Sequence, residues 1–78
     1  MGKIRILYFG ALSEITGKQE ELAEFNGSLK NLIASVIKDN PGLVEKRFSI
    51  AVNQEIYNED KLLSEGDEVA LLPPFSGG

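Results

Sequence analysis

The C-terminal stretch LLPPFSGG contains the residue types of this chain that could do chemistry. Pro73 and Pro74 stiffen the chain where it leaves a strand-like run, because proline fixes its own φ angle and has no amide hydrogen for a ladder. Gly77 and Gly78 have no Cβ, so they can pass through an opening too narrow for a side chain. We therefore expect residues 73–78 to form a flexible delivery tail that reaches up to about 20 Å from the domain.

The group at the end of this tail is the α-carboxylate of Gly78, which is ionised at neutral pH. A carboxylate can attack the α-phosphate of a nucleotide to form an acyl-adenylate, which a thiol or persulfide can then displace. The chain contains no cysteine and no histidine, so disulfides, thiolate catalysis, the usual zinc sites and the commonest general base are excluded. The expected chemistry is therefore that of a carrier with an activated group at its end.

Other residues near the tail are candidates for partner contacts. Phe75 lies beyond the two prolines and outside the expected sheet, which suits an aromatic anchor in a partner's pocket. Phe9 and Leu72 either belong to an apolar docking patch beside the tail or are simply core, and the sequence favours neither interpretation. The predicted partner-binding residues are Leu72, Pro73, Pro74, Phe75, Ser76, Gly77 and Phe9.

Length and charge narrow the class of protein. A chain of 78 residues is one small domain with a small core. The net charge of −4 comes from scattered acids, which repel phosphate backbones, so we expect no nucleic acid and favour a basic protein partner. The apolar runs are far shorter than the roughly 20 residues of a membrane span, and no secretory or myristoylation signal is visible. The expectation is a cytoplasmic protein that does not bind membranes.

Local patterns predict an α+β order of elements. The clearest element is an amphipathic helix, which begins after the N-cap Ser28 and ends near Asn40, before Pro41. Alternating apolar residues predict strands on both sides of it. The expected strands span residues 3–9, 19–25, 48–53, 56–57 and 67–72, with a short helix over 11–17, a turn at Asn26-Gly27 and a helical turn within 58–65.

This order predicts an α+β domain over residues 1–72, in which one main helix packs across one small mixed sheet. A single helix can cover only one face of that sheet. The other face is therefore expected to be either exposed to solvent or used for docking.

Several polar residues have a structural interpretation. Glu20 and Glu21 could suggest acid–base carboxylates, but neighbours on a strand point to opposite faces, so solvated surface is favoured. Asn53 fits a turn in which its side chain bonds its own backbone. Asp67 and Glu68 are expected near the base of the tail, where they either enter the last strand or meet a basic rim of a partner.

The C-terminal third, AVNQEIYNEDKLLSEGDEVALLPPFSGG, closely resembles the small, sulfur-carrying subunit of molybdopterin synthase. The pieces that carry the resemblance are VNQ at 52–54, GDEV at 66–69 and PPFSGG at 73–78. The opening stretch IRILYFGALSEITG is similar to the first strand and short helix of that family. The resemblance therefore spans nearly the whole chain.

The resemblance implies a ubiquitin-like β-grasp fold, which agrees with the order of elements. It implies that an ATP-using adenylyltransferase of the ubiquitin-activating type adenylates Gly78, and that sulfur then replaces one oxygen to give a thiocarboxylate. The tail would enter the large subunit of molybdopterin synthase, where the sulfur builds the dithiolene of molybdopterin within a heterotetramer. Nucleotide, metal and catalytic basic residues would belong to the partners, so this chain is expected to bind no cofactor and only the activating partner uses ATP.

Other classes of function stay open. Sulfur carriers for thiamine synthesis or tRNA thiolation also end in Gly-Gly, although the Pro-Pro-Phe-Ser lead-in and the extra short helix favour the molybdopterin branch. A protein modifier conjugated through Gly78 would begin with the same adenylation. A plain interaction module with an idle or frayed tail would keep full activity without its last two residues. A stand-alone enzyme has the least support, since the chain lacks a phosphate loop and a metal cluster as well as cysteine and histidine.

Overall fold

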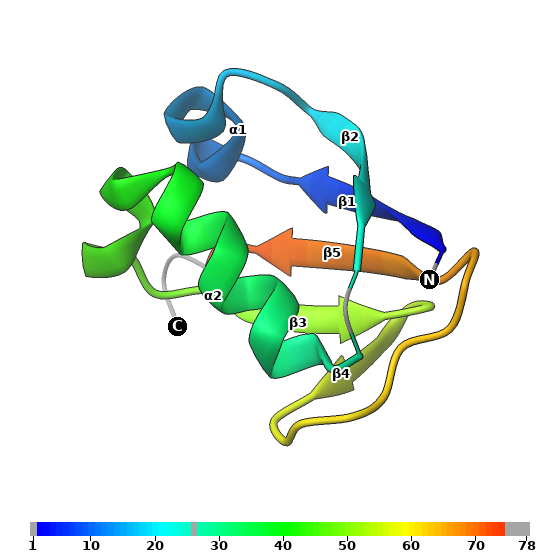
Figure 1. Ribbon diagram of the computed structural model, residues 1–78. Helices are drawn as coiled ribbons and strands as arrows, with labels where there is room; N and C mark the ends of the chain where they lie inside the picture. Colours follow the sequence, from blue (N-terminus) through cyan, green and yellow to red (C-terminus); the bar gives the residue numbers. More distant parts are fainter. Residues whose placement is uncertain (1, 26, 75–78) are drawn as a thin grey trace.

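A five-stranded mixed sheet with strand order β2-β1-β5-β3-β4 organises the chain (Figure 1). The structure is a computed structural model that describes residues 2–25 and 27–74. The central strands β1 and β5 run parallel, and every other neighbouring pair is antiparallel. The strands are β1 (Lys3–Tyr8), β2 (Glu20–Glu24), β3 (Ser49–Val52), β4 (Glu55–Tyr57) and β5 (Glu68–Leu72).

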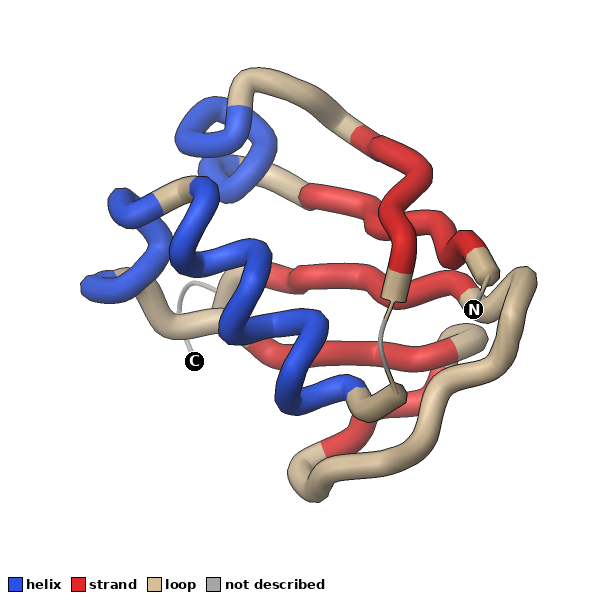
Figure 2. Tube along the Cα trace, in the orientation of Figure 1, coloured by secondary structure: helices blue, strands red, loops and turns tan. Residues whose placement is uncertain are grey.

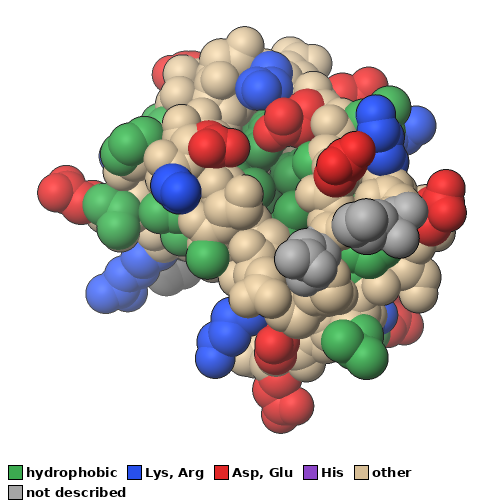
Figure 3. Space-filling view, viewed as in Figure 1, with side chains coloured by type: hydrophobic (Ala, Val, Ile, Leu, Met, Phe, Trp, Pro, Cys, Tyr) green, Lys and Arg blue, Asp and Glu red, His purple; other side chains and the backbone are tan. Residues whose placement is uncertain are grey.

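The helix α2 (Leu29–Asp39) lies across one face of this sheet, and the other face has no helix over it (Figure 2). Two shorter helical segments, α1 (Ala11–Thr16) and the 3-10 helix η1 (Pro41–Glu45), flank it at one end. This arrangement confirms the predicted β-grasp class with one main helix. Acidic and basic side chains are scattered over the helix-side surface, with hydrophobic side chains visible between them (Figure 3).

The alternation in β1 decides which face is buried. Ile4, Ile6 and Tyr8 are almost fully buried beneath α2, whereas Arg5 and Leu7 point to the uncovered face. Val52, Val69 and Leu71 from the neighbouring strands lie on the same covered face, as the strand register requires. The hydrophobic core therefore lies between the sheet and α2.

Helix α2 forms because its start and stop signals are local. The Ser28 side chain accepts a hydrogen bond from the backbone amide of Asn31 at 3.2 Å, which satisfies one of the free amides of the first turn. Leu29, Leu32 and Val36 recur at helical spacing and are buried against the sheet. The helix ends at Asp39, two residues before Pro41, as predicted.

The predicted helical turn within residues 58–65 is wrong. Leu62 instead forms an isolated β-bridge with Ser28, and the Leu63 amide donates to the Gly27 carbonyl at 2.9 Å. The Lys61 carbonyl accepts from the amide of Leu29 at 2.8 Å. These backbone groups pair with the segment ahead of α2, so they cannot pair within a helical turn, and Leu63 is drawn into the core.

The hairpin between β3 and β4 also differs from the expectation for Asn53. The two turn residues, Asn53 and Gln54, both have positive φ, as a tight two-residue hairpin turn requires. The Asn53 side chain does not bond its own backbone. Its amide donates to the Asp67 carboxylate at 3.1 Å, and its oxygen accepts from the Glu68 amide at 3.0 Å. Asn53 therefore joins the hairpin turn to the start of β5.

Glu21 is not the solvated surface residue that was expected. The register of β2 with β1 places Glu21 opposite Ile6, on the covered face, where its carboxylate accepts hydrogen bonds from the Tyr8 hydroxyl and the Lys18 ammonium. Burial and then the contact with Glu21 raise the pKa of Tyr8. Although burial acts to raise it, the hydrogen bonds from Tyr8 and Lys18 hold the pKa of Glu21 below its ordinary value of 4.5.

This depressed pKa predicts an acid-dependent loss of stability. A carboxylate with a lowered folded-state pKa stabilises the fold above its unfolded pKa, and this stabilisation is lost as pH falls through the folded value. We expect the free energy of unfolding, measured with urea, to fall less between pH 7 and pH 3 in Glu21→Gln than in the parent chain. Glu20→Gln, at an exposed neighbouring position, is the matched control and should retain the parent's pH dependence. An equal fall in the free energy of unfolding between pH 7 and pH 3 in the two variants would contradict this role of Glu21.

No helix in the described parts of the chain, residues 2–25 and 27–74, is long and apolar enough to cross a membrane.

Candidate functional site

The root of the tail is built by the two central strands. The Phe9 amide donates to the Leu71 carbonyl at 3.2 Å, which extends the pairing of β1 with β5 one residue past Tyr8. Because Tyr8 and Leu71 are partners on the covered face, Phe9 and Leu72 lie side by side on the uncovered face. The structure thus brings together two of the residues that the sequence singled out from opposite ends of the chain.

The alternative that Phe9 and Leu72 are core residues is wrong. Phe9 is 45% exposed, Leu72 is half-buried, and neither belongs to the core cluster. A large exposed aromatic side chain at the end of a central strand is available for contact with another protein. The binding role of both residues stays a prediction.

The path of the chain at this root is fixed by a close approach of backbone to proline. Pro73 is half-buried and packs against Gly10, where an added Cβ would lie 3.0 Å from the Pro73 Cγ. Gly10 also has a positive φ of 58°, which suits glycine. Pro74 is exposed and is the last described residue. The first proline therefore rests on the turn before α1, and the second faces solvent.

A depression of about 550 Å³ lies beside this root. Its walls come from the end of β1 and the approach to β2, and they mix apolar and polar groups. The lining residues are Leu7, Tyr8, Phe9, Gly10, Ser13, Gln19 and Glu20. The surface next to the tail is thus concave.

The uncovered face of the sheet carries further apolar side chains that the sequence reasoning did not single out. In the strand register, Leu7, Ala70, Ala51 and Ile56 form a row across β1, β5, β3 and β4. Ile56 is 56% exposed, and Leu22 on β2 is 67% exposed. We call Leu7, Phe9, Leu22, Ile56 and Leu72 the open-face patch. The alternation of apolar residues within each strand carried this signal, but only the strand order shows that these residues share one face.

Two acidic residues do not lie where they were expected. Asp67 and Glu68 stand at the start of β5, at the opposite end of that strand from Pro73, so they are not near the base of the tail. Hydrogen bonds from the Ser64 backbone and then the Asn53 side chain hold the pKa of Asp67 below its usual range. On the uncovered face, the Glu68 carboxylate oxygen Oε2 lies 4.0 Å from Nη1 of Arg5. Their role in the structure is to fix the turn that leads into β5.

The predicted residues Phe75, Ser76, Gly77 and Gly78 lie outside the described residues. Among the residues that the structure does describe, no group of three or more acidic, histidine or cysteine side chains could hold a metal ion. The described part of the site consists of the tail root and the open-face patch, which can bind and orient but offer no nucleophile of their own.

Comparison with known proteins relates this arrangement to a family. The sequence profile of the ThiS family matches residues 6–78, which include the whole tail, all of β5 and the second half of β1. The chain belongs to the ThiS family. A relative from Chlamydomonas reinhardtii, named molybdopterin synthase sulfur carrier subunit, is 39% identical over 82 aligned positions that cover 97% of this chain and 99% of the relative. The resemblance predicted from the sequence is thereby confirmed.

Solved structures similar to this ThiS family chain agree with that relation. A Pyrococcus furiosus protein named for subunit 1 of the molybdopterin converting factor superposes with a TM-score of 0.88 at 25% identity, covering 96% of this chain and all of that one. A chain from the complex of subunits 1 and 2 of the Helicobacter pylori molybdopterin-converting factor gives a TM-score of 0.74 at 29% identity, covering 97% and 99%. The fold extends over essentially the full length in both.

Proposed function

We propose that this ThiS family chain is the sulfur carrier subunit of a molybdopterin synthase. The single observation that carries the proposal is the full-length similarity to proteins of that name, at up to 39% identity among the relatives compared. The structure supports it with a tail that leaves the central strand β5 beside an exposed apolar patch. Such an arrangement suits a domain that docks by one face while its end reaches into a partner.

In this proposal the reaction takes place at Gly78. Its carboxylate attacks the α-phosphate of ATP held by an adenylyltransferase of the ubiquitin-activating type, and pyrophosphate leaves. A persulfide sulfur then displaces AMP from the acyl carbon, and cleavage of its S–S bond by a thiol leaves a C-terminal thiocarboxylate. This chain binds no cofactor itself in the proposed scheme, because the nucleotide belongs to the activating partner.

The second partner is the large subunit of the synthase. The similar chain from Helicobacter pylori was solved in a complex of subunits 1 and 2, which supports a two-subunit assembly of this kind. We propose that the open-face patch docks on the large subunit while residues 73–78 enter its active site. There the thiocarboxylate sulfur forms a bond to a carbon of the substrate, and water then hydrolyses the acyl–sulfur bond, which leaves the sulfur for the dithiolene and regenerates the Gly78 carboxylate.

The mass of the C-terminal peptide tests the proposal. After incubation with ATP, its activating enzyme and a sulfur donor, the peptide that ends in Gly78 should gain the mass difference between sulfur and oxygen. The change has to be localised to that peptide, because oxidation of Met1 adds nearly the same mass. An unchanged peptide in the presence of a competent activating enzyme would refute the carrier function. A covalent ladder on a denaturing, reducing gel would point instead to a protein modifier.

A further inference from the structure

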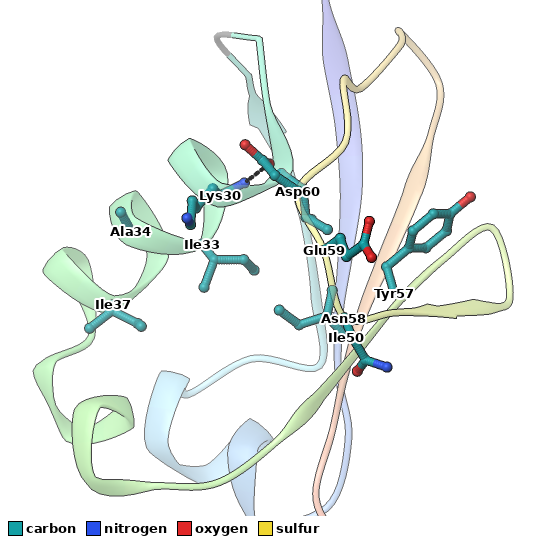
Figure 4. Close-up of a pocket in the computed structure, with 10 residues that line it drawn as sticks. Lys30, Ile33, Ala34, Ile37, Ile50, Tyr57, Asn58, Glu59 and Asp60 are labelled. Atoms are coloured by element: carbon teal, nitrogen blue, oxygen red, sulfur yellow. Dashed lines mark hydrogen bonds between the residues drawn. The ribbon is translucent and has the colours of Figure 1, made fainter.

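A second, separate surface lies on the other side of the sheet from the open-face patch. It is a groove of about 370 Å³ between α2 and the β3–β4 hairpin (Figure 4). Its lining is almost entirely apolar at its base: Leu29, Ile33, Ala34 and Ile37 come from α2, and Ile50 and Tyr57 from the strands. Figure 4 shows Ile33 and Ile50 extending toward one another across it. The open-face patch contributes no residue to the lining of this groove.

Two of the α2 side chains that line the groove are less buried than those of the core cluster. Leu32 and Val36 are buried in the core cluster together with side chains of the central strands, whereas Ile33 and Ile37 are only half-buried. Ala34 is exposed and lines the groove, in the helical row that holds Lys30 before it and Lys38 after it. The short alanine side chain leaves a gap between two lysines through which the apolar base can be reached.

The strand that borders this groove has a free edge. β4 is the last strand of the sheet, and within the described residues its only strand partner is β3. The register pairs Glu55 with Val52 and Tyr57 with Ile50. The side chains of Glu55 and Tyr57 therefore point to the face of the sheet that carries the groove. An edge of this kind accepts an added strand, whose backbone bonds to β4 and whose alternate side chains enter the groove.

The charges on this edge indicate what kind of segment would be added. Glu55 and Glu59 are exposed, and neither forms an ion pair with any residue in the described part of the chain. The Asp60 carboxylate, by contrast, is already bonded to the backbone amides of Lys30 and Lys61 at 2.8 and 2.9 Å. A cross-strand pair of opposite charge at Glu55 would stabilise an added basic strand.

We infer that the β4 edge and this groove bind an extended, basic segment of a partner protein. The segment adds antiparallel to β4, with apolar side chains over Ile33 and beside Tyr57, whose ring has the Lys61 ammonium 4.9 Å from its centroid, and a lysine or arginine opposite Glu55. The groove lies on the opposite face of the sheet from the open-face patch, and the two surfaces meet only at β4, whose Ile56 belongs to that patch. Binding at this edge does not depend on the proposed sulfur transfer.

The test uses the full chain, labelled for NMR, and the capped peptide Ser-Ile-Thr-Ile-Thr-Lys-Ser as the probe. Its two isoleucines and its lysine share one face of an extended strand, in the order that antiparallel addition to β4 requires. We expect the peptide to shift the amide resonances of Glu55–Tyr57 and the methyl resonances of Ile33 and Ile50. The same peptide with glutamate in place of lysine should bind more weakly.

Two variants locate the binding surface. Ala34→Arg fills the groove with a long cation on a good helix former and should weaken binding about tenfold. Ser35→Arg changes the next exposed position of α2, outside the groove, and should leave the affinity unchanged. Glu55→Gln removes the cross-strand charge and should weaken binding about two- to fivefold.

Four results would overturn the inference. The first is equal binding of the lysine and glutamate peptides, and the second is a set of peptide-induced shifts centred on Phe9 and Leu22. The third is a change of the groove resonances with protein concentration alone, which would make a second copy of this chain the occupant. The fourth is a change of the same resonances on deletion of residues 75–78, which would make the chain's own tail the occupant.

Discussion

Deletion of Gly77 and Gly78 is expected to abolish formation of the adenylate and of the thiocarboxylate while leaving the fold intact. The truncated chain would end at Ser76, whose carboxylate is two residues, or about 7 Å of extended chain, short of the original position. Reacting groups have to meet within a few ångströms, so a partner's active site that fits the full tail would not receive this carboxylate. Release of pyrophosphate in the presence of ATP and the activating enzyme measures the first step.

Stability separates this loss of function from unfolding. The core cluster of the described residues lies within residues 4–71, and β5 ends at Leu72, so removal of the last two residues should leave the midpoint of thermal unfolding unchanged. Ser76→Ala keeps the length of the tail and is the matched control that should retain most of the activity. Full activity of the truncated chain would show that the tail is idle and that the chain is a plain interaction module.

Phe9→Asp is expected to weaken binding to the large subunit by about 30- to 1000-fold, the range of an aromatic hot spot worth about 2–4 kcal/mol. Phe9 is the aromatic member of the open-face patch and lies beside Leu72 at the root of the tail. Its side chain is 45% exposed in the free domain, so the substitution should change the free energy of unfolding by less than about 1 kcal/mol. Isothermal titration with the purified large subunit measures the first quantity and urea unfolding the second.

Val44→Asp is the matched control for this substitution. Val44 is 68% exposed on η1, away from the uncovered face of the sheet, so the same change of apolar to acidic side chain should not affect binding. Equal losses in Phe9→Asp and Val44→Asp would indicate a general effect of added negative charge. An unchanged affinity in Phe9→Asp would place the docking surface elsewhere on the domain.

The parts of the fold that the sequence predicted correctly are those whose signals are local. Ser28 and Pro41 mark the two ends of α2 within a few residues of the helix itself, and the apolar spacing between them gives its buried face. Gly17 ends α1 in a left-handed conformation that favours glycine, so this end too is marked by a single residue. These elements, once ordered along the chain, were enough to predict an α+β domain with one main helix across one sheet, and the resemblance to a known family then implied the β-grasp class.

The parts that were wrong depend on partners distant in the sequence. Residues 58–65 contain no local signal that their backbone bonds to the segment before α2, and so their composition suggested a helical turn. Glu21 could not be paired with Tyr8 until the register of β2 with β1 was known. The open-face patch also could not be predicted from local sequence. The side chains of Phe9 and Ile56 come from different strands, and only the strand order and register place them on one face of the sheet.

The position of β5 in the sheet has a mechanical consequence. β5 is hydrogen-bonded along both edges, to β1 in parallel and to β3 in antiparallel, and it continues directly into Pro73. A pull along the tail therefore loads these two ladders in shear, so that many hydrogen bonds resist together instead of opening one after another. Among the described strands, an edge strand such as β4 has only one ladder, to β3, to resist a force along its axis. A domain that is held at its end and drawn into another protein is thus tethered through the strand most able to bear the load.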